Sequence, residues 1–375
     1  MKRFFIPFFS LAFFASCGQP LPLPDHPTMI PKFPKSKTAT SEAVAPPKEV
    51  PAFNPAKEAP WLKVPLGLDN ENLFIPAGNP LTPEKVELGK LLYFDTRLSA
   101  DNTVSCATCH DPEKVWTDQA AVSTGIKGQK GARSAPTVVN ATYMGLQFWD
   151  GRAADLEEQA LGPLVNPIEM GNKNHDEVVK KLAAVAGYKP YFQKAFGSDQ
   201  VTKGNIAKAI ASFERTVLSG NSRYDRWTYG EATAMKTSEI RGRDLFFGKA
   251  NCTRCHAGPN FSDSMFHNLG VGTDKSKPDE GRFVVTKAKE DRGAFKTPTV
   301  REITKTEPYM HDGSEKTLEE VVAFYNKGGI KNANLDPRML PLNLSDQEKA
   351  DLVSFMKALE GNPSPAVEPP AAFPK

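Results

Sequence analysis

Apolar residues recur at helical spacing in several segments between residues 82 and 360, and each segment begins with a residue that can cap a helix. Thr82-Pro83-Glu84 precedes a segment with Leu88, Leu91 and Leu92 on one face. Further helices are expected over 175–186, behind Asn174, and after Thr202, Thr237, Thr317 and Ser345. The last two starts have a Glu three residues later, as capping boxes do. No convincing run of alternating residues indicates strands, so the pattern predicts a mostly α-helical protein.

Both ends of the chain differ from this helical region. Residues 1–17 begin with Met1-Lys2-Arg3, continue through a Phe-rich apolar stretch too short to span a bilayer, and reach Cys17 after small residues. This pattern is typical of a bacterial lipoprotein signal, in which Cys17 carries the lipids; ordinary signal-peptidase cleavage nearby is the alternative. Residues 18–62 are proline-rich and predict an extended tether, and 363–375 predict a similar tail. We expect a periplasmic, lipid-anchored protein of a Gram-negative bacterium.

The charge distribution argues against a nucleic-acid-binding protein. The formal net charge is +3 over 375 residues, and lysines and acidic residues are interspersed. This distribution provides no basic surface for a nucleic acid.

Two short motifs indicate the chemistry. Cys106-Ala107-Thr108-Cys109-His110 and Cys252-Thr253-Arg254-Cys255-His256 both have the C-x-x-C-H spacing of covalent haem attachment. The two thiols add to the haem vinyl groups, and the following imidazole binds the iron from one side. A four-thiolate zinc site and a redox dithiol are alternatives, but the His after each pair favours haem. Each motif is followed by helices, so we expect two packed cytochrome c-like domains, over 63–225 and 226–362.

The opposite face of each haem decides its function, because a six-coordinate haem transfers electrons whereas a five-coordinate haem can bind peroxide. His26 and His175 are expected to be solvated. His267 and His311 belong to the second domain and could be ligands or second-shell donors. Soft ligands among the methionines would be Met265, Met310 or Met339.

Over residues 80–360 the chain resembles the bacterial di-haem cytochrome c peroxidase and MauG superfamily. The resemblance rests on both haem motifs, with Asp111-Pro112 after the first, and on five other segments: Arg133-Ser134-Ala135-Pro136-Thr137, Phe148-Trp149-Asp150-Gly151-Arg152, Asn166-Pro167-Ile168-Glu169-Met170, Phe295-Lys296-Thr297-Pro298-Thr299 and Pro308-Tyr309-Met310-His311-Asp312-Gly313. In that family the N-terminal haem reacts with peroxide and the C-terminal haem transfers electrons.

Two departures from the peroxidase members point toward MauG-like members. Many peroxidases of the family carry a blocking His in a loop that corresponds to 124–129, and this loop has none. The resemblance therefore implies that the first haem is open at rest. At the second haem, Tyr325 takes the place of a Met ligand, and a phenolate favours higher oxidation states than a thioether does. The alternative is that Tyr325 belongs to the apolar helix face with Val321 and Val322.

The resemblance also implies roles around the haems. Glu169 matches the acid–base group of peroxide cleavage, although a surface carboxylate is the alternative. Gln159 matches an amide of the same pocket. Trp149 matches an indole between the haems that relays electrons; its alternative role is a buried aromatic anchor. The family binds calcium nearby, and the matching positions are Thr306, Pro308 and Ser134, where Ser replaces the usual Asn.

These observations predict a di-haem c-type peroxidase that reduces hydrogen peroxide with electrons from a small periplasmic cytochrome c or cupredoxin. The main alternative is MauG-like oxidation of Trp or Tyr side chains on a partner protein. The third hypothesis is an electron carrier without peroxidase activity, which would require Met144 or Met170 as a ligand of the first haem. Peroxidases of the family often form dimers, so the resemblance implies that this protein can form a homodimer.

Overall fold

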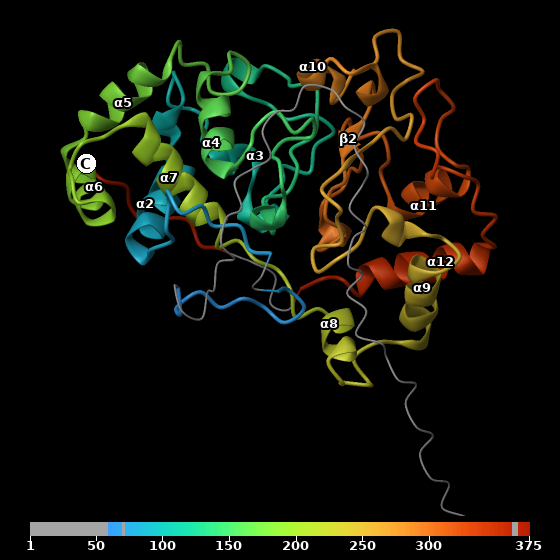
Figure 1. Ribbon diagram of the computed structural model, residues 1–375. Coiled ribbons are helices and arrows are strands. Elements are labelled where there is room, and N and C mark those ends of the chain that lie inside the picture. Colours follow the sequence, from blue (N-terminus) through green and yellow to red (C-terminus); the bar gives the residue numbers. More distant parts are fainter. Residues whose placement is uncertain (1–58, 70–71, 362–366) are drawn as a thin grey trace, which may run out of the picture. The chain divides into compact units, whose positions relative to one another are not determined.

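The computed structural model describes residues 59–69, 72–361 and 367–375 (Figure 1). The expected signal peptide, Cys17 and the tether up to residue 58 lie outside this part of the chain. Within it the protein is mostly helical, as predicted, and a single two-stranded sheet pairs β1 (Phe266–His267) antiparallel with β2 (Phe295–Lys296). None of the helices found in these ranges has the length and apolar character needed to cross a membrane.

The predicted helix starts are confirmed. Thr82, Asn174 and Thr202 each accept a backbone N–H at the start of α2 (Pro83–Phe94), α5 (His175–Ala183) and α7 (Lys203–Glu214). Capping boxes at Thr317 and Ser345 begin α11 (Leu318–Asn326) and α12 (Asp346–Lys357). Helix α9 (Thr237–Phe247) begins at the predicted residue, with Lys236 as its cap. Helix α5 ends at Ala183, three residues before the predicted end.

The described ranges contain five further helices: α3 (Cys106–Cys109), α4 (Leu156–Val165), α6 (Lys189–Phe196), α8 (Arg223–Thr228) and α10 (Phe283–Thr286). Short 3-10 helices occupy the connections, at Thr96–Leu98, Pro112–Lys114, Ile126–Gly128, Ala141–Tyr143, Ala186–Tyr188, Cys252–Arg254, Lys289–Asp291 and Ile303–Lys305.

Each of the two larger hydrophobic clusters, the N-terminal cluster within 88–217 and the C-terminal cluster within 235–359, is built around one close helix crossing. In the N-terminal lobe α2 packs on α7, and a Cβ on Gly89 would lie 1.9 Å from the carbonyl oxygen of Ala209 (Figure 1). In the C-terminal lobe α9 packs on α12, and a Cβ on Gly242 would lie 1.8 Å from the carbonyl oxygen of Asp351. Glycine is required at both crossings because any side chain would separate the helices.

Helix α8 packs with the C-terminal cluster. Tyr224 makes edge-to-face contacts with Phe261 and Phe355 at ring-centroid distances of 5.5 and 5.4 Å. Its backbone N–H donates to the carbonyl of Ala358 at 3.1 Å. The predicted boundary after residue 225 therefore falls inside a helix that packs on the second lobe, and Asp225 of this helix also lies against Gly67 of the first predicted domain.

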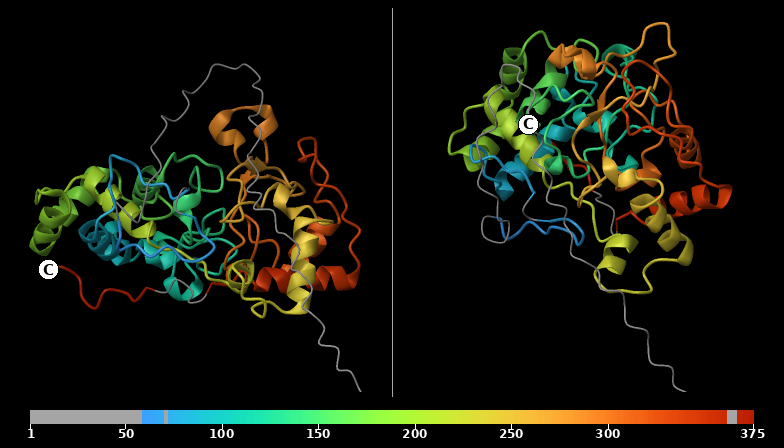
Figure 2. Two further views of the ribbon diagram at one scale, coloured as in Figure 1. Left: turned by 60° about the horizontal axis from the view of Figure 1, so that its bottom comes forward. Right: turned by 45° about the vertical axis from the view of Figure 1, so that its right-hand side comes forward.

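The end of the chain is docked on the N-terminal lobe. Gly187 N–H donates to the carbonyl of Lys375 at 2.7 Å, and Arg97 Nη1 donates to the carbonyl of Pro374 at 2.9 Å. Val367 packs against the N-terminal cluster. Both views of Figure 2 show this red segment returning to the helices of the first lobe. The sequence predicted only a proline-rich tail here, and the structure adds a docking site for its end.

Candidate di-haem site

The first haem motif forms the short helix α3. Its start is stabilised by a capping box between Ser105 and Thr108, and both cysteines are half-buried and free. The Nδ1 atom of His110 lies 3.3 Å from the carbonyl oxygen of Trp116, and burial lowers the pKa of this imidazole. The ring is therefore neutral near pH 7, and its other nitrogen, Nε2, remains for a metal.

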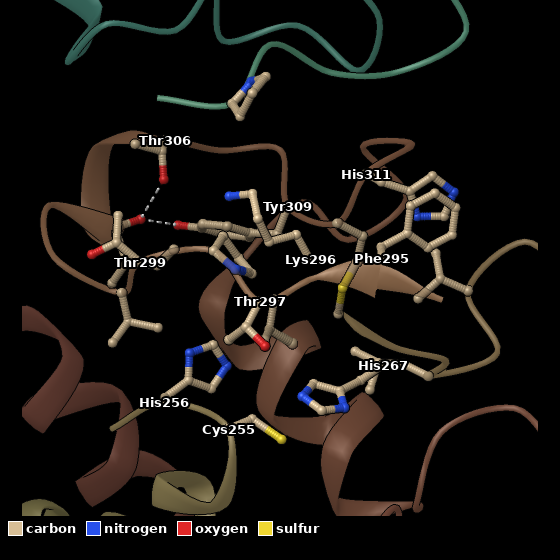
Figure 3. Close-up of a pocket in the computed structure, with 18 of the residues that line it drawn as sticks. Cys255, His256, His267, Phe295, Lys296, Thr297, Thr299, Thr306, Tyr309 and His311 are labelled. Carbon is tan, nitrogen blue, oxygen red and sulfur yellow. Dashed lines mark hydrogen bonds between the residues drawn. The ribbon is translucent and has the colours of Figure 1, made fainter. Parts of the chain in front are cut away.

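The second motif lines a cavity of about 290 Å³. Cys252 and Cys255 are free, and Nδ1 of His256 lies 3.0 Å from the carbonyl oxygen of Phe261. Burial lowers the pKa of His256 as it does that of His110. Figure 3 shows Cys255 and His256 together at one side of the cavity. The second motif therefore offers the same donors as the first.

These residues fit two covalently attached c-type haems. Each motif supplies two free thiols and a neutral imidazole whose Nδ1 already has a carbonyl partner, so Nε2 is left for iron. The zinc alternative requires four thiolates around one ion. Cys106 packs with the N-terminal cluster and Cys252 with the C-terminal cluster, so the motifs form two separate sites.

Tyr325 on α11 lines the same cavity as His256. Burial raises the pKa of its phenol, and nearby Cys255 acts in the same direction. Val321 and Val322 pack in the C-terminal cluster, of which Tyr325 is not a member. Within the part of the chain that the structure describes, its hydroxyl has no hydrogen-bond partner. This hydroxyl is therefore available as the expected second ligand.

Glu169 lies close to the first motif. Its Oε1 accepts a hydrogen bond of 2.8 Å from Asn166 Nδ2. Burial raises the pKa of the carboxyl group, whereas the positive charge of Arg152 lowers it. The carboxylate in turn raises the pKa values of the Cys106 and Cys109 thiols, which requires it to be near the first haem site. A buried carboxyl group whose pKa is raised holds its proton more strongly than a free glutamic acid and can act as an acid or a base.

The loop 124–129 packs directly on the Glu169 segment. Ile126 N–H donates to the Glu169 carbonyl at 2.9 Å, and Gln129 Nε2 donates to the Pro167 carbonyl at 3.0 Å. A Cβ on Gly125 would lie 2.0 Å from the Ile168 carbonyl oxygen. These contacts fix the loop, which contains no histidine, beside the predicted acid–base group.

Gln159 on α4 has a buried Oε1 that lacks a hydrogen-bond partner among residues 59–69, 72–361 and 367–375. A buried acceptor left without a donor costs free energy. The group therefore fits a site where a donor arrives with a ligand, as the sequence predicted for the peroxide pocket.

Trp149 connects the two lobes. Its indole Nε1 donates to the carbonyl of Ser134 at 2.9 Å, and its own carbonyl accepts from the backbone N–H of Lys296 at 2.8 Å. The residue also lines the cavity of the second motif. The role of a structural anchor and the predicted relay role are therefore both compatible with its position.

The three expected calcium positions line the same cavity. The Ser134 hydroxyl donates to the Met310 carbonyl at 3.0 Å, and the Thr306 hydroxyl donates to the Ile303 carbonyl at 3.4 Å. Thr306 and Pro308 flank Glu307, whose buried Oε2 has no hydrogen-bond partner in the described ranges.

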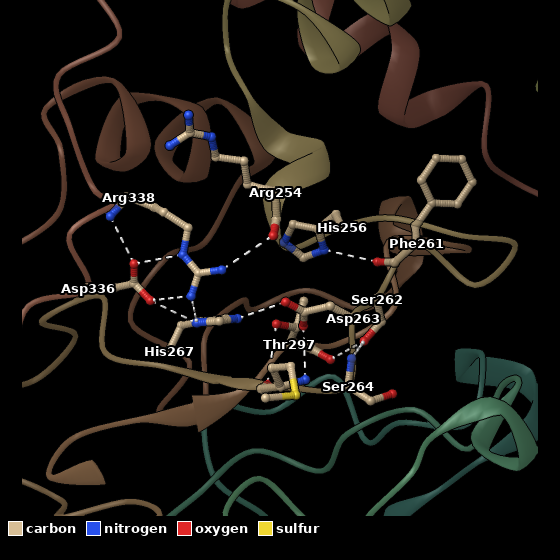
Figure 4. A network of polar contacts seen from close by, with 11 residues as sticks. Arg254, His256, Phe261, Ser262, Asp263, Ser264, His267, Thr297, Asp336 and Arg338 are labelled. Carbon is tan, nitrogen blue, oxygen red and sulfur yellow. Dashed lines mark hydrogen bonds and ion pairs between the residues drawn. The ribbon is translucent and has the colours of Figure 1, made fainter. Parts of the chain in front are cut away.

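His267 and His311 are engaged by other residues. The His267 Nε2 lies 2.9 Å from Asp263 Oδ2, and Nδ1 lies 2.8 Å from Asp336 Oδ2 (Figure 4). Burial lowers its pKa, but the contacts with Asp263 and Cys255 raise it to about 10. Arg338 Nη2 also lies 2.7 Å from Nδ1, so both ring nitrogens of His267 are engaged by side chains of the second lobe. The His311 ring stacks on Phe295, with centroids 3.6 Å apart.

The methionine ligands of the electron-carrier hypothesis are also placed. The sulfur of Met144 accepts from Asn260 Nδ2 at 3.9 Å and from Ser264 Oγ at 3.7 Å, both in the second lobe. Met170 is 3% exposed and packs in the N-terminal core. The contacts of Met144 place its sulfur toward the second lobe.

The charged groups that the sequence analysis did not single out include Lys296, half-buried in the cavity wall, and Glu214, buried in the first lobe. Lys296 belongs to a segment used only for the resemblance. Glu214 follows the apolar positions Ile206, Ile210 and Phe213 of α7. The sequence feature that could have indicated the burial of Glu214 is its position directly after Phe213, near the end of that apolar stretch.

Comparisons with known proteins agree with this site. A family profile described as di-haem cytochrome c peroxidase matches residues 83–233, and a cytochrome c profile matches 240–360. The chain is 42% identical to the methylamine utilization protein MauG of Methylorubrum extorquens, over 77% of this chain and 82% of that protein. It is 40% identical to cytochrome c551 peroxidase of Nitrosomonas europaea, over 77% and 83%.

A solved structure is also similar. The crystal structure of a MauG-like protein associated with microbial copper homeostasis matches with a TM-score of 0.72 and 35% identity, over 83% of this chain and 96% of that chain. The two helical lobes, each with one C-x-x-C-H site, define a di-haem c-type cytochrome. The chain belongs to the family of di-haem cytochrome c peroxidases and MauG proteins. The predicted resemblance, fold class and oxidoreductase class are confirmed.

Proposed function

We propose that the protein reduces hydrogen peroxide to water at the first haem, with electrons that a small exported cytochrome c or cupredoxin delivers through the second. The observation that carries this proposal is Glu169, a carboxyl group held by Asn166 beside the first motif, against a loop without histidine. Reduction of one peroxide to two waters consumes two electrons and two protons. When bound, the haem iron supplies the site for peroxide and the electron transfer.

The protein residues handle the protons and the path. Glu169 accepts the proton of the bound peroxide oxygen and returns it to the departing oxygen, which assists cleavage of the O–O bond. Gln159 on α4 holds the oxygen species through its amide group. The Trp149 indole, fixed by Ser134 and Lys296, relays electrons between the lobes.

The test compares Glu169→Gln with Glu113→Gln, an exposed carboxylate that follows the first haem motif. The glutamine keeps the hydrogen-bonding shape but cannot move the proton. We expect the rate of reaction with one equivalent of peroxide to fall about 10²–10⁴-fold in Glu169→Gln and to be unchanged in the control. Equal rates in both variants, with both haems loaded, would remove the assigned role.

Oxidation of Trp or Tyr side chains on a partner protein is the second candidate, and Tyr325 is the observation that favours it. A phenolate ligand holds the second haem in higher oxidation states than a thioether does. We expect Tyr325→Met to raise the reduction potential of that haem and to shorten the life of the peroxide-oxidised protein. Rapid steady-state turnover of the wild type with reduced cytochrome c would favour the peroxidase over this candidate.

Calcium binding by Thr306, Pro308 and Ser134 is part of the proposal. Its support is the buried, unpartnered Oε2 of Glu307 between the first two positions, since carboxylate and carbonyl oxygens are the ligands that calcium prefers. Metal analysis of the purified protein before and after dialysis against a chelator tests it. A calcium content before dialysis below about one ion for every ten protein molecules contradicts it.

Location and assembly complete the proposal. The protein is exported to the periplasm of a Gram-negative bacterium and anchored by lipids on Cys17, with a homodimer as its assembly. The support is the signal-like sequence of residues 1–17. Cys17→Ser should move the mature protein from the membrane fraction to the soluble fraction, and an unchanged distribution would contradict the anchor.

A further inference from the structure

Lys296 is held at the edge of the second haem site by its backbone. It is the second residue of β2, paired with Phe266 of β1, and its N–H donates to the Trp149 carbonyl at 2.8 Å. Its side chain lines the cavity that Cys252, Cys255 and His256 also line. Figure 3 shows the lysine chain extending into this cavity on the side of Tyr309 and Thr306.

The ammonium group has no counter-charge from the protein. In the described ranges, neither a hydrogen bond nor an ion pair involves Lys296 Nζ. Burial alone accounts for the lowering of its pKa to about 8, without a contribution from any carboxylate. The side chain is half-buried in the cavity wall, and an ammonium group that a bound cofactor shields from water gains from a counter-charge on that cofactor.

Other cations that are shielded from solvent have carboxylate partners. The half-buried Arg133 pairs with Asp150 and Asp279, and the buried Arg215 and Arg301 pair with Glu157 and Asp225. Among the other cations that line the cavity, Arg338 is paired with Asp336, and Arg254 is exposed. Among the described cations that line the cavity, Lys296 is thus the one that is half-buried and has no carboxylate partner.

We propose that Lys296 binds a propionate carboxylate of the haem attached at Cys252 and Cys255. A c-type haem carries two such carboxylates, which need cationic or hydrogen-bonding partners when the haem is buried. A lysine ammonium is a compact charge with three donors and suits one carboxylate oxygen. Since its backbone is bonded to Trp149, the same ion pair fixes the edge of the haem beside the indole. The inference rests on the two haems and on no part of the peroxide chemistry.

The test uses the holoprotein with Lys296→Met and Lys296→Arg. Lys277→Met, at an exposed lysine of the same lobe, is the matched control. The readout is the reduction potential of the second haem by spectroelectrochemistry, with haem content from the pyridine haemochrome spectrum. Loss of a nearby positive charge favours ferric over ferrous iron. We expect Lys296→Met to shift this equilibrium at least tenfold, which is about 59 mV for one electron, and Lys296→Arg to remain within threefold of the wild type.

The other results are also decisive. A Met variant that matches the control overturns the proposal. If Lys296→Met loads no second haem but Lys296→Arg loads it fully, the charge is required for the haem and the proposal stands; failure of both overturns it. A free oxyanion from solution, instead of a haem propionate, is the alternative partner of the Lys296 ammonium group. A wild-type potential that changes when chloride replaces phosphate at constant ionic strength, with no such change in Lys296→Met, would assign the site to that anion.

Discussion

Replacing Glu214 with glutamine should remove a pH dependence of stability that this buried carboxyl group imposes on the N-terminal lobe. Its side chain is 4% exposed, and its Oε2 has no hydrogen-bond partner in the ranges that the structure describes. Burial raises its pKa from 4.5 to about 8; Arg215 opposes this rise and Glu157 adds to it. At pH 7 the group is therefore mostly protonated in the folded protein.

The sign and size of the effect follow from this pKa. Between pH 4.5 and 8 the folded state binds more protons than the unfolded state. The stability associated with Glu214 is therefore fully present below pH 4.5 and is lost as the pH rises to 8. At about 1.36 kcal/mol per unit of pKa, a rise from 4.5 to about 8 corresponds to a loss of at most about 5 kcal/mol.

Urea denaturation of the holoprotein at about pH 5 and at about pH 9 measures this loss. Glu214→Gln should match the wild type at the lower pH within about 1 kcal/mol and exceed it by a few kcal/mol at the higher pH. Glu87→Gln, at an exposed position on α2, should show no such divergence. A stability difference between Glu214→Gln and the wild type that is the same at both pH values would refute the reasoning.

A second measurement connects the same group to the first haem. The Glu214 carboxylate raises the pKa of the Cys106 thiol, so its charge is felt at the attachment site of that haem. Its ionisation should therefore lower the reduction potential of the first haem as the pH rises through about 8. The glutamine variant should lack this step, and a step that persists in it would have to come from another group.

Two further predictions concern packing. Gly125→Val should slow the peroxide reaction at least about tenfold with both haems retained, because the new Cβ meets the backbone beside Glu169. Gly131→Ala, with no contact closer than 3.6 Å, is the control, and equal rates would contradict the steric argument. Arg301→Met should cost about 3–5 kcal/mol of unfolding free energy, since it leaves the buried Asp225 unpaired. If urea denaturation shows a loss of unfolding free energy below about 1 kcal/mol, the ion pair between Arg301 and Asp225 adds little to stability.

Local signals made much of the fold predictable. Thr82, Asn174, Thr202, Thr317 and Ser345 begin helices because their side-chain oxygens accept backbone N–H groups of the first turn. Both haem motifs are equally local, since five consecutive residues define each one. Such features depend on neighbours within a few residues, which the sequence displays directly.

Helix α4 was not predicted from the sequence, although its first residues carry a helix-start signal. Asp155 accepts the N–H of Glu158 at its start, and Leu156, Ala160 and Leu164 are buried at helical spacing. Pro163 lies inside this helix, and a proline there normally ends one. The contact of α4 with α7 compensates for this local cost, and tertiary contacts of this kind are not written in the local sequence.

Lys296 could not have been identified from its own neighbourhood. A lysine is expected to be exposed, and the Phe295–Thr299 segment contains nothing that contradicts this. Its place in the cavity wall arises from pairing with β1, thirty residues earlier, and from the backbone bond to Trp149, which lies further back in the chain. The same holds for the pair between Arg133 and Asp279, which joins the two lobes.

The contacts around Trp149 link the proposed electron relay to the docking of the two lobes. The indole is bonded to the Ser134 carbonyl, and Ser134 itself donates from its N–H to the His311 carbonyl and from its hydroxyl to the Met310 carbonyl. Lys296 donates to the Trp149 carbonyl from the other lobe. Movement of one lobe against the other would therefore break the bonds that hold the Trp149 backbone and Ser134, the residue that accepts the indole N–H. A rigid interface is needed for relay between two fixed haems, and the proposed propionate partner belongs to the same set of contacts.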